Sequence, residues 1–367
     1  MTGRFSWLSL TSKKRTTGFL EISCGTACAS TGFPTTSSEQ SSPCKQCTAC
    51  VRVNGVKSSS FTVGTGLRQG CVLSPILFAT FMDWIEKRSR GSECVKIGQV
   101  KVSRLLFADD LALLASSQQD LQCALDRFAA ESELAGMKVS TKKTEVMVLL
   151  RLAVDCTLHV SGVQLQQVEK FKYLGSWFAS DGRLDSELDS RINLSSVVLR
   201  ELWSVMGSAR LSTEAKLAIY KSLFRPILTY GHESWIMTKR TRSQVQEAEM
   251  RFLRRIFGVT RMDQIRNTWI REAINIEPLL LWVEKSQLRW RGHVERMSSE
   301  RLVKQIFEAE PEGRRPVGRP RTRWKDQSDA LIRRAGFDPS DAAPMAADRT
   351  GWRELSRSLL PRPDSRT

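Results

Sequence analysis

Residues 104–115 read RLLFADDLALLA, two apolar runs separated by adjacent carboxylates. This pattern predicts a strand, a tight turn and a second strand. Neighbouring residues within a strand point to opposite faces, whereas two carboxylates at a turn can reach the same pocket. Clustered carboxylates hold the two divalent ions of phosphoryl transfer, and Mg²⁺ prefers such oxygen ligands. Asp109 and Asp110 are therefore candidate catalytic and metal-binding residues, with an ordinary hairpin turn as the competing interpretation.

The segments around this hairpin mix helical and strand patterns. Ser74-Pro75 is a helix start, with Ser at the N-cap, followed by an apolar run to about Arg88. Residues 118–135 have the helical period, and Gly136 suits their C-terminus. The apolar residues expected on or near one face of that helix are Leu121, Leu125, Phe128 and Leu134.

Short β-prone runs complete this first part of the chain. Asn54-Gly55 lies between valines and predicts a type I′ hairpin turn. We expect further strands at residues 95–102, 146–150, 158–163 and 171–178, with Asp181-Gly182 as a turn. Strands and helices within one segment indicate an α+β domain.

The pattern becomes helical after Asp181. Helical periods cover residues 186–230, divided by Pro226, and residues 242–257. A third helix is expected at residues 278–297, beginning at Pro278. Residues 310–325 are rich in Pro, Gly and Arg and predict an extended linker or tail.

The charge of the chain points to a polyanionic partner. Its 367 residues include 56 Lys and Arg against 39 Asp and Glu, a formal net charge of +17. Residues 239–334 contain 23 basic and 13 acidic side chains, and so carry +10 of that total. A basic excess concentrated in about a quarter of the chain favours a nucleic-acid-binding surface over uniform solubilisation.

Membrane insertion and secretion have no support. No run of about 18 apolar residues occurs, so we expect no membrane span. The N-terminal Lys/Arg cluster follows a short apolar patch, the reverse of a signal peptide. We expect a nuclear or cytoplasmic protein that is not secreted.

Nine cysteines in such a chain do not indicate a disulfide framework. Four of them approach the spacing of a zinc site, namely Cys24, Cys28, Cys44 and Cys47, with incidental cysteines in a Ser/Thr-rich segment as the alternative. Four others lie in apolar surroundings and are expected in the core: Cys71, Cys94, Cys123 and Cys156.

Several ordered motifs resemble the successive blocks of a reverse transcriptase, and more narrowly of the polymerase of non-LTR (LINE-type) retrotransposons. The blocks are FTVGTGLRQGCVLSPILF (61–78), LLFADDLALLA (105–115), STKKTEVMVL (140–149) and FKYLGSWFASDG (171–182). Later segments resemble the C-terminal part of the same polyproteins: PILTYGHESWIMT, RFLRRIFGVT, QLRWRGHVERM and GRRPVGRPRTRW. The resemblance covers roughly residues 51–335.

The resemblance implies a role for each matching residue. Asp109 and Asp110 match the catalytic acidic pair, preceded by Phe107 where the family often has an aromatic residue. The block that borders the incoming nucleotide and the template is matched by Arg68, Gln69 and Gly70. Lys142 and Lys143 lie in the block whose lysine helps to protonate pyrophosphate, with a solvated loop as the alternative. The hairpin that steadies the primer end is matched by Tyr173, Leu174 and Gly175, with simple strand packing as the alternative.

One catalytic residue of that family has no counterpart in the sequence. The family carries another Asp on a strand before the GLRQG block, but the first Asp of this chain is Asp83, within the helix after Ser74-Pro75. Residues 1–82 contain only Glu21 and Glu39 as acids. Mg²⁺ or Mn²⁺ is implied by the family, yet two carboxylates leave such a site incomplete. We expect a truncated polymerase, inactive by itself.

Arginines in the second half are candidate contacts to nucleic-acid phosphates. Arg251, Arg254 and Arg255 are spaced i, i+3, i+4 on one helix, with a solvated helix face as the alternative. Arg319 and Arg321 lie in a Gly-Arg-Pro segment similar to the AT-hook, although Val317 stands where a basic residue is usual. His293 has no nearby cysteine, so we expect a polar residue near a helix end rather than a metal ligand.

These observations predict an α+β fold in which an incomplete polymerase palm precedes a helical thumb and a basic helical region. The expected segments are 1–50 of low order, 51–182 the partial palm, 183–260 the thumb, 261–335 the basic region and 336–367 a tail. The partners implied are an RNA template and a DNA primer or target DNA. The alternatives to an enzyme are a catalytically dead nucleic-acid-binding remnant and the product of a decayed element. The sequence does not indicate an oligomeric state.

Overall fold

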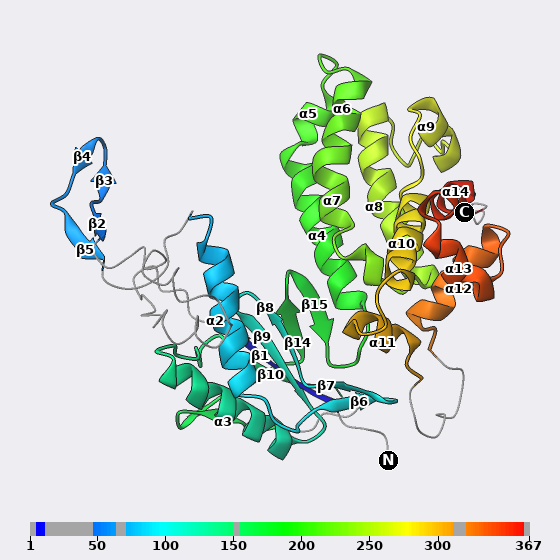
Figure 1. The fold of residues 1–367 in the computed structure, drawn as a ribbon. Coiled ribbons are helices and arrows are strands. Elements are labelled where there is room, and N and C mark those ends of the chain that lie inside the picture. Colours follow the sequence, from blue (N-terminus) through cyan, green and yellow to red (C-terminus); the bar gives the residue numbers. More distant parts are fainter. Residues whose placement is uncertain (1–4, 12–46, 64–70, 150–154, 311–320, 363–367) are drawn as a thin grey trace. The chain divides into compact units, whose positions relative to one another are not determined.

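The computed structural model describes residues 5–11, 47–63, 71–149, 155–310 and 321–362 (Figure 1). The chain divides into two compact units, Met1–Phe171 and Lys172–Thr367. Each is described by itself below. The mixture of sheets and helices confirms the predicted α+β class.

The first unit is built on a five-stranded sheet. Its strand order is β13 (Gln166–Gln167), β10 (Glu145–Leu149), β1 (Phe5–Thr11), β9 (Asp110–Ala115), β8 (Arg104–Phe107). The central strand β1 pairs antiparallel with both β9 and β10, so the last two run in the same direction. The sequence predicted β8, β9 and β10 but not β1, whose residues lie in the segment expected to be of low order.

Two helices pack against this sheet and enclose the core of the first unit. They are α2 (Ser74–Arg88) and α3 (Gln118–Leu134). From α3, Leu121, Leu125 and Phe128 are buried as predicted. They join apolar residues of β9, β10 and α2 in a single cluster. Leu134 is 76% exposed, because it is the last helical residue, where the chain turns at Gly136.

Several short runs predicted as single strands are hairpins instead. The run 95–102 is β6 (Val95–Ile97) and β7 (Val100–Val102), because Gly98 has a φ of +57° and reverses the chain. The run 158–163 divides in the same way at Ser161-Gly162 into β11 (His159–Val160) and β12 (Val163–Gln164).

Two other hairpins precede α2. The predicted turn at Asn54-Gly55 is confirmed, and it joins β3 (Arg52–Val53) to β4 (Val56–Lys57). Strands β2 (Cys47–Ala49) and β5 (Phe61–Val63) pair outside them.

A hairpin spans the boundary at residues 171–172, and the second unit continues as a helical assembly. The hairpin is β14 (Lys170–Tyr173) and β15 (Ser176–Ala179). The helices that follow are α4 (Asp185–Glu201), α5 (Trp203–Gly207), α6 (Thr213–Ile219), α7 (Arg225–Leu228) and α8 (Lys239–Phe257). Their core is centred on the packed rings of Tyr220, Phe224 and Phe252.

Pro226 does not divide the helical stretch as the sequence predicted. A π-helical segment, Tyr220–Phe224, connects α6 directly to α7. Proline lacks a backbone N–H, and a wider turn is one of the ways a helix accommodates this. The interruption lies earlier, at residues 208–212.

The last helices of the second unit include residues that were expected to form a tail. After α9 (Asn267–Ala273), α10 (Leu279–Glu295) and α11 (Leu302–Glu308) come α12 (Trp324–Arg334), α13 (Ala342–Ala347) and α14 (Arg349–Ser358). Trp352, Leu355 and Leu359 are buried in one cluster with α10 and α12. Residues 336–362 thus belong to the packed structure, because this apolar face of α14 has a partner surface.

Within the described residues, no helix is both long and apolar enough to cross a membrane.

Candidate nucleic-acid and metal site

Asp109 and Asp110 lie at the turn between β8 and β9, where the sequence predicted them. Phe107 and Asp110 are paired in the register, so Ala108 and Asp109 form a two-residue loop. Both carboxylate residues are half-buried, whereas Phe107 is 61% exposed. Ala108 has a φ of +52°, a left-handed conformation that is strained for alanine. The loop therefore presents two adjacent carboxylates at one end of the sheet.

The strand beside this loop brings Thr11 to the same end of the sheet. The register of β1 on β9 pairs Thr11 with Asp110 and Ser9 with Ala112. Residues directly opposite in an antiparallel pair have Cβ atoms about 4.5–5.5 Å apart. Position 11 is therefore where a neighbouring strand could supply a third carboxylate, and the residue there is threonine.

Lys143 lies at this end of the sheet as well. It is exposed in a turn two residues before Glu145, which pairs with Ser9 of β1. Because β9 and β10 run in the same direction, the residues that precede them emerge at the same end. The fold thus brings Lys143 and the two aspartates to the same end of the sheet, although 33 or more positions separate them in the sequence.

The residues at this edge do not fit a two-metal site. Two divalent ions about 3.5–4 Å apart need carboxylates from more than one strand. In the described part of the chain, no group of three or more His, Cys, Asp and Glu side chains could hold a metal ion. The register places threonine, and not a carboxylate residue, opposite Asp110 on the neighbouring strand.

Several other residues singled out in the sequence lie outside the described part of the chain or away from the aspartates. Arg68, Gln69 and Gly70 lie outside the described residues, and so do Arg319 and three of the four cysteines proposed for zinc. Among the cysteines expected in the core, only Cys156 is buried. Cys123 is exposed, because its position on α3 faces away from the sheet.

The Leu174-Gly175 turn joins β14 to β15 in the second unit, directly after Tyr173. Leu174 has a φ of +49° and Gly175 of +85°, the backbone of a two-residue hairpin turn. The Tyr230 hydroxyl donates a hydrogen bond to the carbonyl oxygen of Leu174 at 2.8 Å. The guanidinium of Arg191 donates another to the carbonyl oxygen of Gly175 at 2.5 Å. Both backbone acceptors of the turn are therefore bound by side chains of the same unit.

A buried ion pair supports that turn from helix α4. Arg191 Nε donates to Glu187 Oε1 at 2.6 Å, and Glu187 Oε2 accepts from the backbone N–H of Trp177 at 2.7 Å. The guanidinium of Arg191 lies 4.5 Å from the ring centroid of Tyr230. A fully partnered buried network of this kind is rigid. It holds the hairpin proposed to steady a primer in one conformation.

The three arginines predicted on one face of α8 have different surroundings. Arg251 is exposed and lies 3.5 Å from Glu247. Arg254 donates to the Ile265 carbonyl oxygen at 3.0 Å and to Asn267 Oδ1 at 2.9 Å.

Arg255 donates to the carbonyl oxygen of Trp203 and stacks 4.2 Å from the centroid of that indole ring. Because these contacts engage Arg254 and Arg255 within the protein, only Arg251 of the predicted set projects to solvent. In the last predicted segment, Arg321 Nη1 donates to the Asp181 carbonyl oxygen at 3.0 Å.

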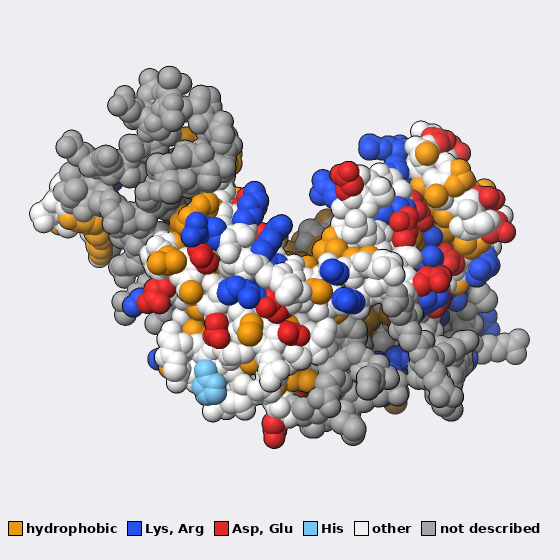
Figure 2. All heavy atoms as spheres, turned by 60° about the horizontal axis from the view of Figure 1, so that its bottom comes forward, with side chains coloured by type: hydrophobic (Ala, Val, Ile, Leu, Met, Phe, Trp, Pro, Cys, Tyr) orange, Lys and Arg blue, Asp and Glu red, His pale blue; other side chains and the backbone are white. Residues whose placement is uncertain are grey.

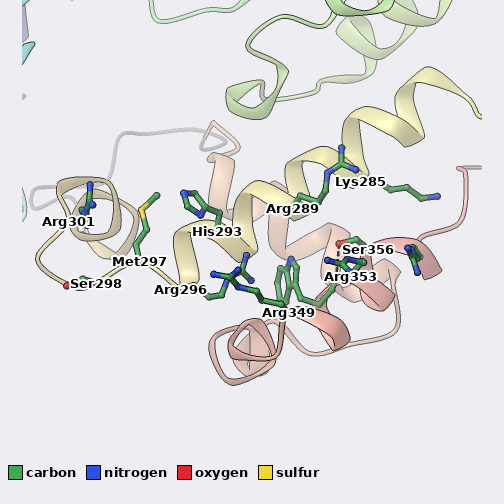
Figure 3. A pocket seen from close by; sticks show the side chains of 12 residues that line it. Lys285, Arg289, His293, Arg296, Met297, Ser298, Arg301, Arg349, Arg353 and Ser356 are labelled. Atoms are coloured by element: carbon green, nitrogen blue, oxygen red, sulfur yellow. Dashed lines mark hydrogen bonds between the residues drawn. The ribbon is translucent and has the colours of Figure 1, made fainter. Parts of the chain in front are cut away.

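The sequence reasoning missed two rows of basic residues that share a cavity of about 850 Å³. Figure 3 shows their side chains along the cavity. One row is on α10 and its C-cap (Lys285, Arg289, His293 and the cap residue Arg296), and the other is on α14 (Arg349, Arg353 and Arg357). The i, i+4, i+8 spacing of the second row is readable from the sequence. It was missed because residues 336–367 carry no net charge and were taken as a tail.

On the face drawn in Figure 2, Lys and Arg side chains lie among Asp and Glu side chains. The charged side chains that line the cavity are, by contrast, all basic.

Part of the chain matches a known protein family. Residues 27–178 match the family described as reverse transcriptase (RNA-dependent DNA polymerase). A transposon-derived protein of Caenorhabditis elegans is 27% identical over 248 residues, which cover 63% of this chain and 86% of that protein.

Two proteins from mobile elements are also similar in sequence. The RNA-directed DNA polymerase from mobile element jockey of Drosophila melanogaster is 26% identical over 57% of this chain and 23% of its own length. The Pol polyprotein from the type-1 retrotransposable element R2 of Nasonia vitripennis is 30% identical over 34% of this chain and 13% of its own length. The chain thus spans less than a quarter of either protein.

Proposed function

Because this chain is related to the reverse transcriptases of non-LTR retrotransposons, we propose that it binds nucleic acid as they do but does not polymerise DNA by itself. In this proposal the sheet of the first unit is a polymerase palm, and helices α4 to α8 are a thumb. Asp109 and Asp110 are the remaining catalytic pair. RNA template and DNA primer or target DNA are the natural partners.

The observation that carries the proposal is the register of β1 on β9. The strand next to the Asp109-Asp110 loop is present, but it offers Thr11 opposite Asp110. Loss of a metal-binding carboxylate removes several kcal/mol of transition-state stabilisation. At about 1.36 kcal/mol per factor of ten, the rate falls by about 10³-fold or more.

The remaining site assignments belong to the same proposal. Arg68, Gln69, Gly70 and Phe107 border the template and nucleotide, and Lys143 lies at the aspartate edge. The rigid turn after Tyr173 supports the end of a primer, which accords with its buried support from Arg191. Mg²⁺ or Mn²⁺ would need a third carboxylate from another chain or segment to be held in a two-metal arrangement.

Primer extension tests the catalytic part. The full chain is incubated with a DNA primer on an RNA template, dNTPs and Mg²⁺ or Mn²⁺. We expect no incorporation above that of an Asp109→Ala, Asp110→Ala variant. Robust incorporation that Asp109→Ala abolishes would overturn the assignment.

A salt titration tests the binding part. The affinity for a labelled RNA or DNA strand is measured from 50 to 300 mM KCl. We expect log K to fall linearly with log salt, by about 0.7 per phosphate contact for a single strand. A slope near zero would instead favour the product of a decayed element with no selected function.

A further inference from the structure

The cavity between α10, the segment 296–301 that follows it and α14 is lined by basic side chains. Its lining contains seven Lys and Arg side chains and no Asp or Glu: Lys285, Arg289, Arg296, Arg301, Arg349, Arg353 and Arg357. We propose that this cavity binds the phosphate backbone of a single RNA or DNA strand. The inference deepens the proposed function, and it rests on that function for the class of its ligand.

The two helices present their basic residues in rows along their length rather than as a point cluster. On α14, Arg349, Arg353 and Arg357 recur every fourth residue, so they lie on one face of the helix. A neighbouring face of the helix is buried through Trp352 and Leu355, and Trp352 also lines the cavity. At a rise of 1.5 Å per residue, the α14 row extends about 12 Å and the row from Lys285 to Arg296 about 16 Å.

Most of these cations have no protein partner. Lys285 pairs with Glu277 at 2.5 Å, and Arg296 donates to the Ala346 carbonyl oxygen at 2.9 Å. Across the parts of the chain that the structure describes, no ion pair or side-chain hydrogen bond engages the other five: Arg289, Arg301, Arg349, Arg353 and Arg357. Five exposed guanidiniums converging on one cavity repel each other unless an anion binds among them.

The spacing of the two rows is set by close packing of α14 on α10. The indole Nε1 of Trp352 donates to the carbonyl oxygen of Leu288 at 2.8 Å. Gly292 makes room for that ring, because a Cβ at position 292 would lie 2.2 Å from Trp352 Nε1. The cavity walls are therefore held by a buried contact and not by the charged side chains themselves, so the site exists before a ligand binds.

The extent of the rows favours a strand over a small anion. A phosphate group carries a charge of about −1.5 to −2, so one group cannot neutralise five guanidiniums. Nor can it reach both ends of rows longer than about 10 Å. Successive phosphates of one strand can do both, and the guanidinium fork binds phosphate oxygens through paired hydrogen bonds. His293, exposed beside Trp290, adds a ring on which a base can stack.

The test compares two variants of the full chain that change the net charge equally. The first replaces Arg349, Arg353 and Arg357 by Gln. The matched control replaces Lys101, Arg266 and Arg333 by Gln, three exposed residues that lie outside the cavity and outside helices α4 to α8. Binding of fluorescein-labelled 20-nucleotide RNA and DNA strands is measured by anisotropy at several KCl concentrations. Thermal unfolding followed by circular dichroism checks that both variants fold like the wild type.

We expect the cavity variant to bind either strand at least tenfold more weakly at 100 mM KCl. Its salt slope should fall by about 2, the value for three lost contacts to a single strand. The control should stay within twofold of the wild type. Equal losses in both variants would overturn the proposal, since the effect would then be one of net charge. So would release of the strand by 5 mM inorganic phosphate at constant ionic strength, which would reveal a small-anion site. Absence of strand binding by the wild-type chain would instead defeat the proposed function.

Discussion

Ala108 is a strained residue at the centre of the candidate site. Its φ of +52° lies in the left-handed region, which costs a non-glycine residue about 1–2 kcal/mol. Local strain persists where the surrounding structure enforces it, and here the pairing of Phe107 with Asp110 closes the loop around it. The closed loop fixes the backbone position of Asp109.

Replacing Ala108 by glycine should therefore stabilise the protein. We expect Ala108→Gly to raise the free energy of unfolding by about 1 kcal/mol in urea denaturation, because glycine adopts positive φ without strain. Ala112→Gly is the matched control, because Ala112 is buried in the regular strand β9 and should lose stability. A loss of stability in both variants would show that the loop is not strained.

Strand β1 is the element that decides whether the aspartate edge can hold metal. It occupies the centre of the sheet, and its last residue, Thr11, is paired with Asp110. A carboxylate introduced there would extend the Asp109-Asp110 pair to three, drawn from two strands. The pairing of β1 with β9 can stay as it is when this carboxylate is introduced.

Thr11→Asp should accordingly create a cation site. We expect it to tighten Mn²⁺ binding, measured by calorimetry, at least tenfold over the wild type, since a third charged oxygen ligand adds to the pair. The gain should disappear in a Thr11→Asp, Asp110→Asn variant. If Thr11→Asp binds Mn²⁺ no better than the wild type, the paired positions are not within ligand distance of each other.

The contact between α10 and α14 depends on the lack of a side chain at Gly292. Gly292→Ala would place a methyl group 2.2 Å from Trp352 Nε1, so the helices must shift. We expect a loss of about 1–3 kcal/mol, typical of overpacking, in urea denaturation. Adding Trp352→Leu should recover part of that loss, since the smaller side chain frees the space. Additive losses in the double variant would contradict a direct clash.

At the scale of the whole second unit, a buried carboxylate ties the chain end to the helices. Glu284 of α10 is almost fully buried, and it binds Arg334 of α12 and Arg362, which it meets at 2.8 Å. Burial by itself raises the pKa of Glu284, but the hydrogen bonds and charges of the two arginines outweigh it. The net pKa lies below its ordinary value. These contacts join residues 284 and 362 across 78 positions of sequence.

This arrangement predicts acid sensitivity with a definite sign. A carboxylate with a lowered folded pKa contributes stability at pH values above the unfolded pKa of about 4.5, and loses it as the pH falls through the folded value. We expect Glu284→Gln to be less stable than the wild type at pH 7 and to show a shallower loss of stability below pH 4.5. Thermal unfolding from pH 7 to pH 3 measures both. Parallel pH profiles for the two proteins would mean that Glu284 does not titrate in this range.

Much of the candidate site could be predicted from local patterns in the sequence. The Asp109-Asp110 hairpin, the Asn54-Gly55 turn and helix α3 each depend on neighbouring residues, so pattern alone predicted them. Hairpin turns at Gly98 and Gly162 were read as continuous strands, because short apolar runs look alike whether or not a glycine reverses them. The buried support of the Leu174-Gly175 turn could not be foreseen, since Tyr230 lies 56 residues away from Leu174.

The sequence by itself determined the resemblance to reverse transcriptases, the position of the two adjacent carboxylates and the lack of an aspartate before Asp83, because each is a property of residue order. Only the tertiary structure decided which residue stands beside those carboxylates. Strand β1 reaches Asp110 across about a hundred residues, and strand pairing over that distance leaves no local pattern. The tertiary structure also decided that the C-terminal segment, which has no net charge, lines one side of a basic cavity. Burial of Trp352 determines which face of α14 is exposed, and the arginines lie on that face.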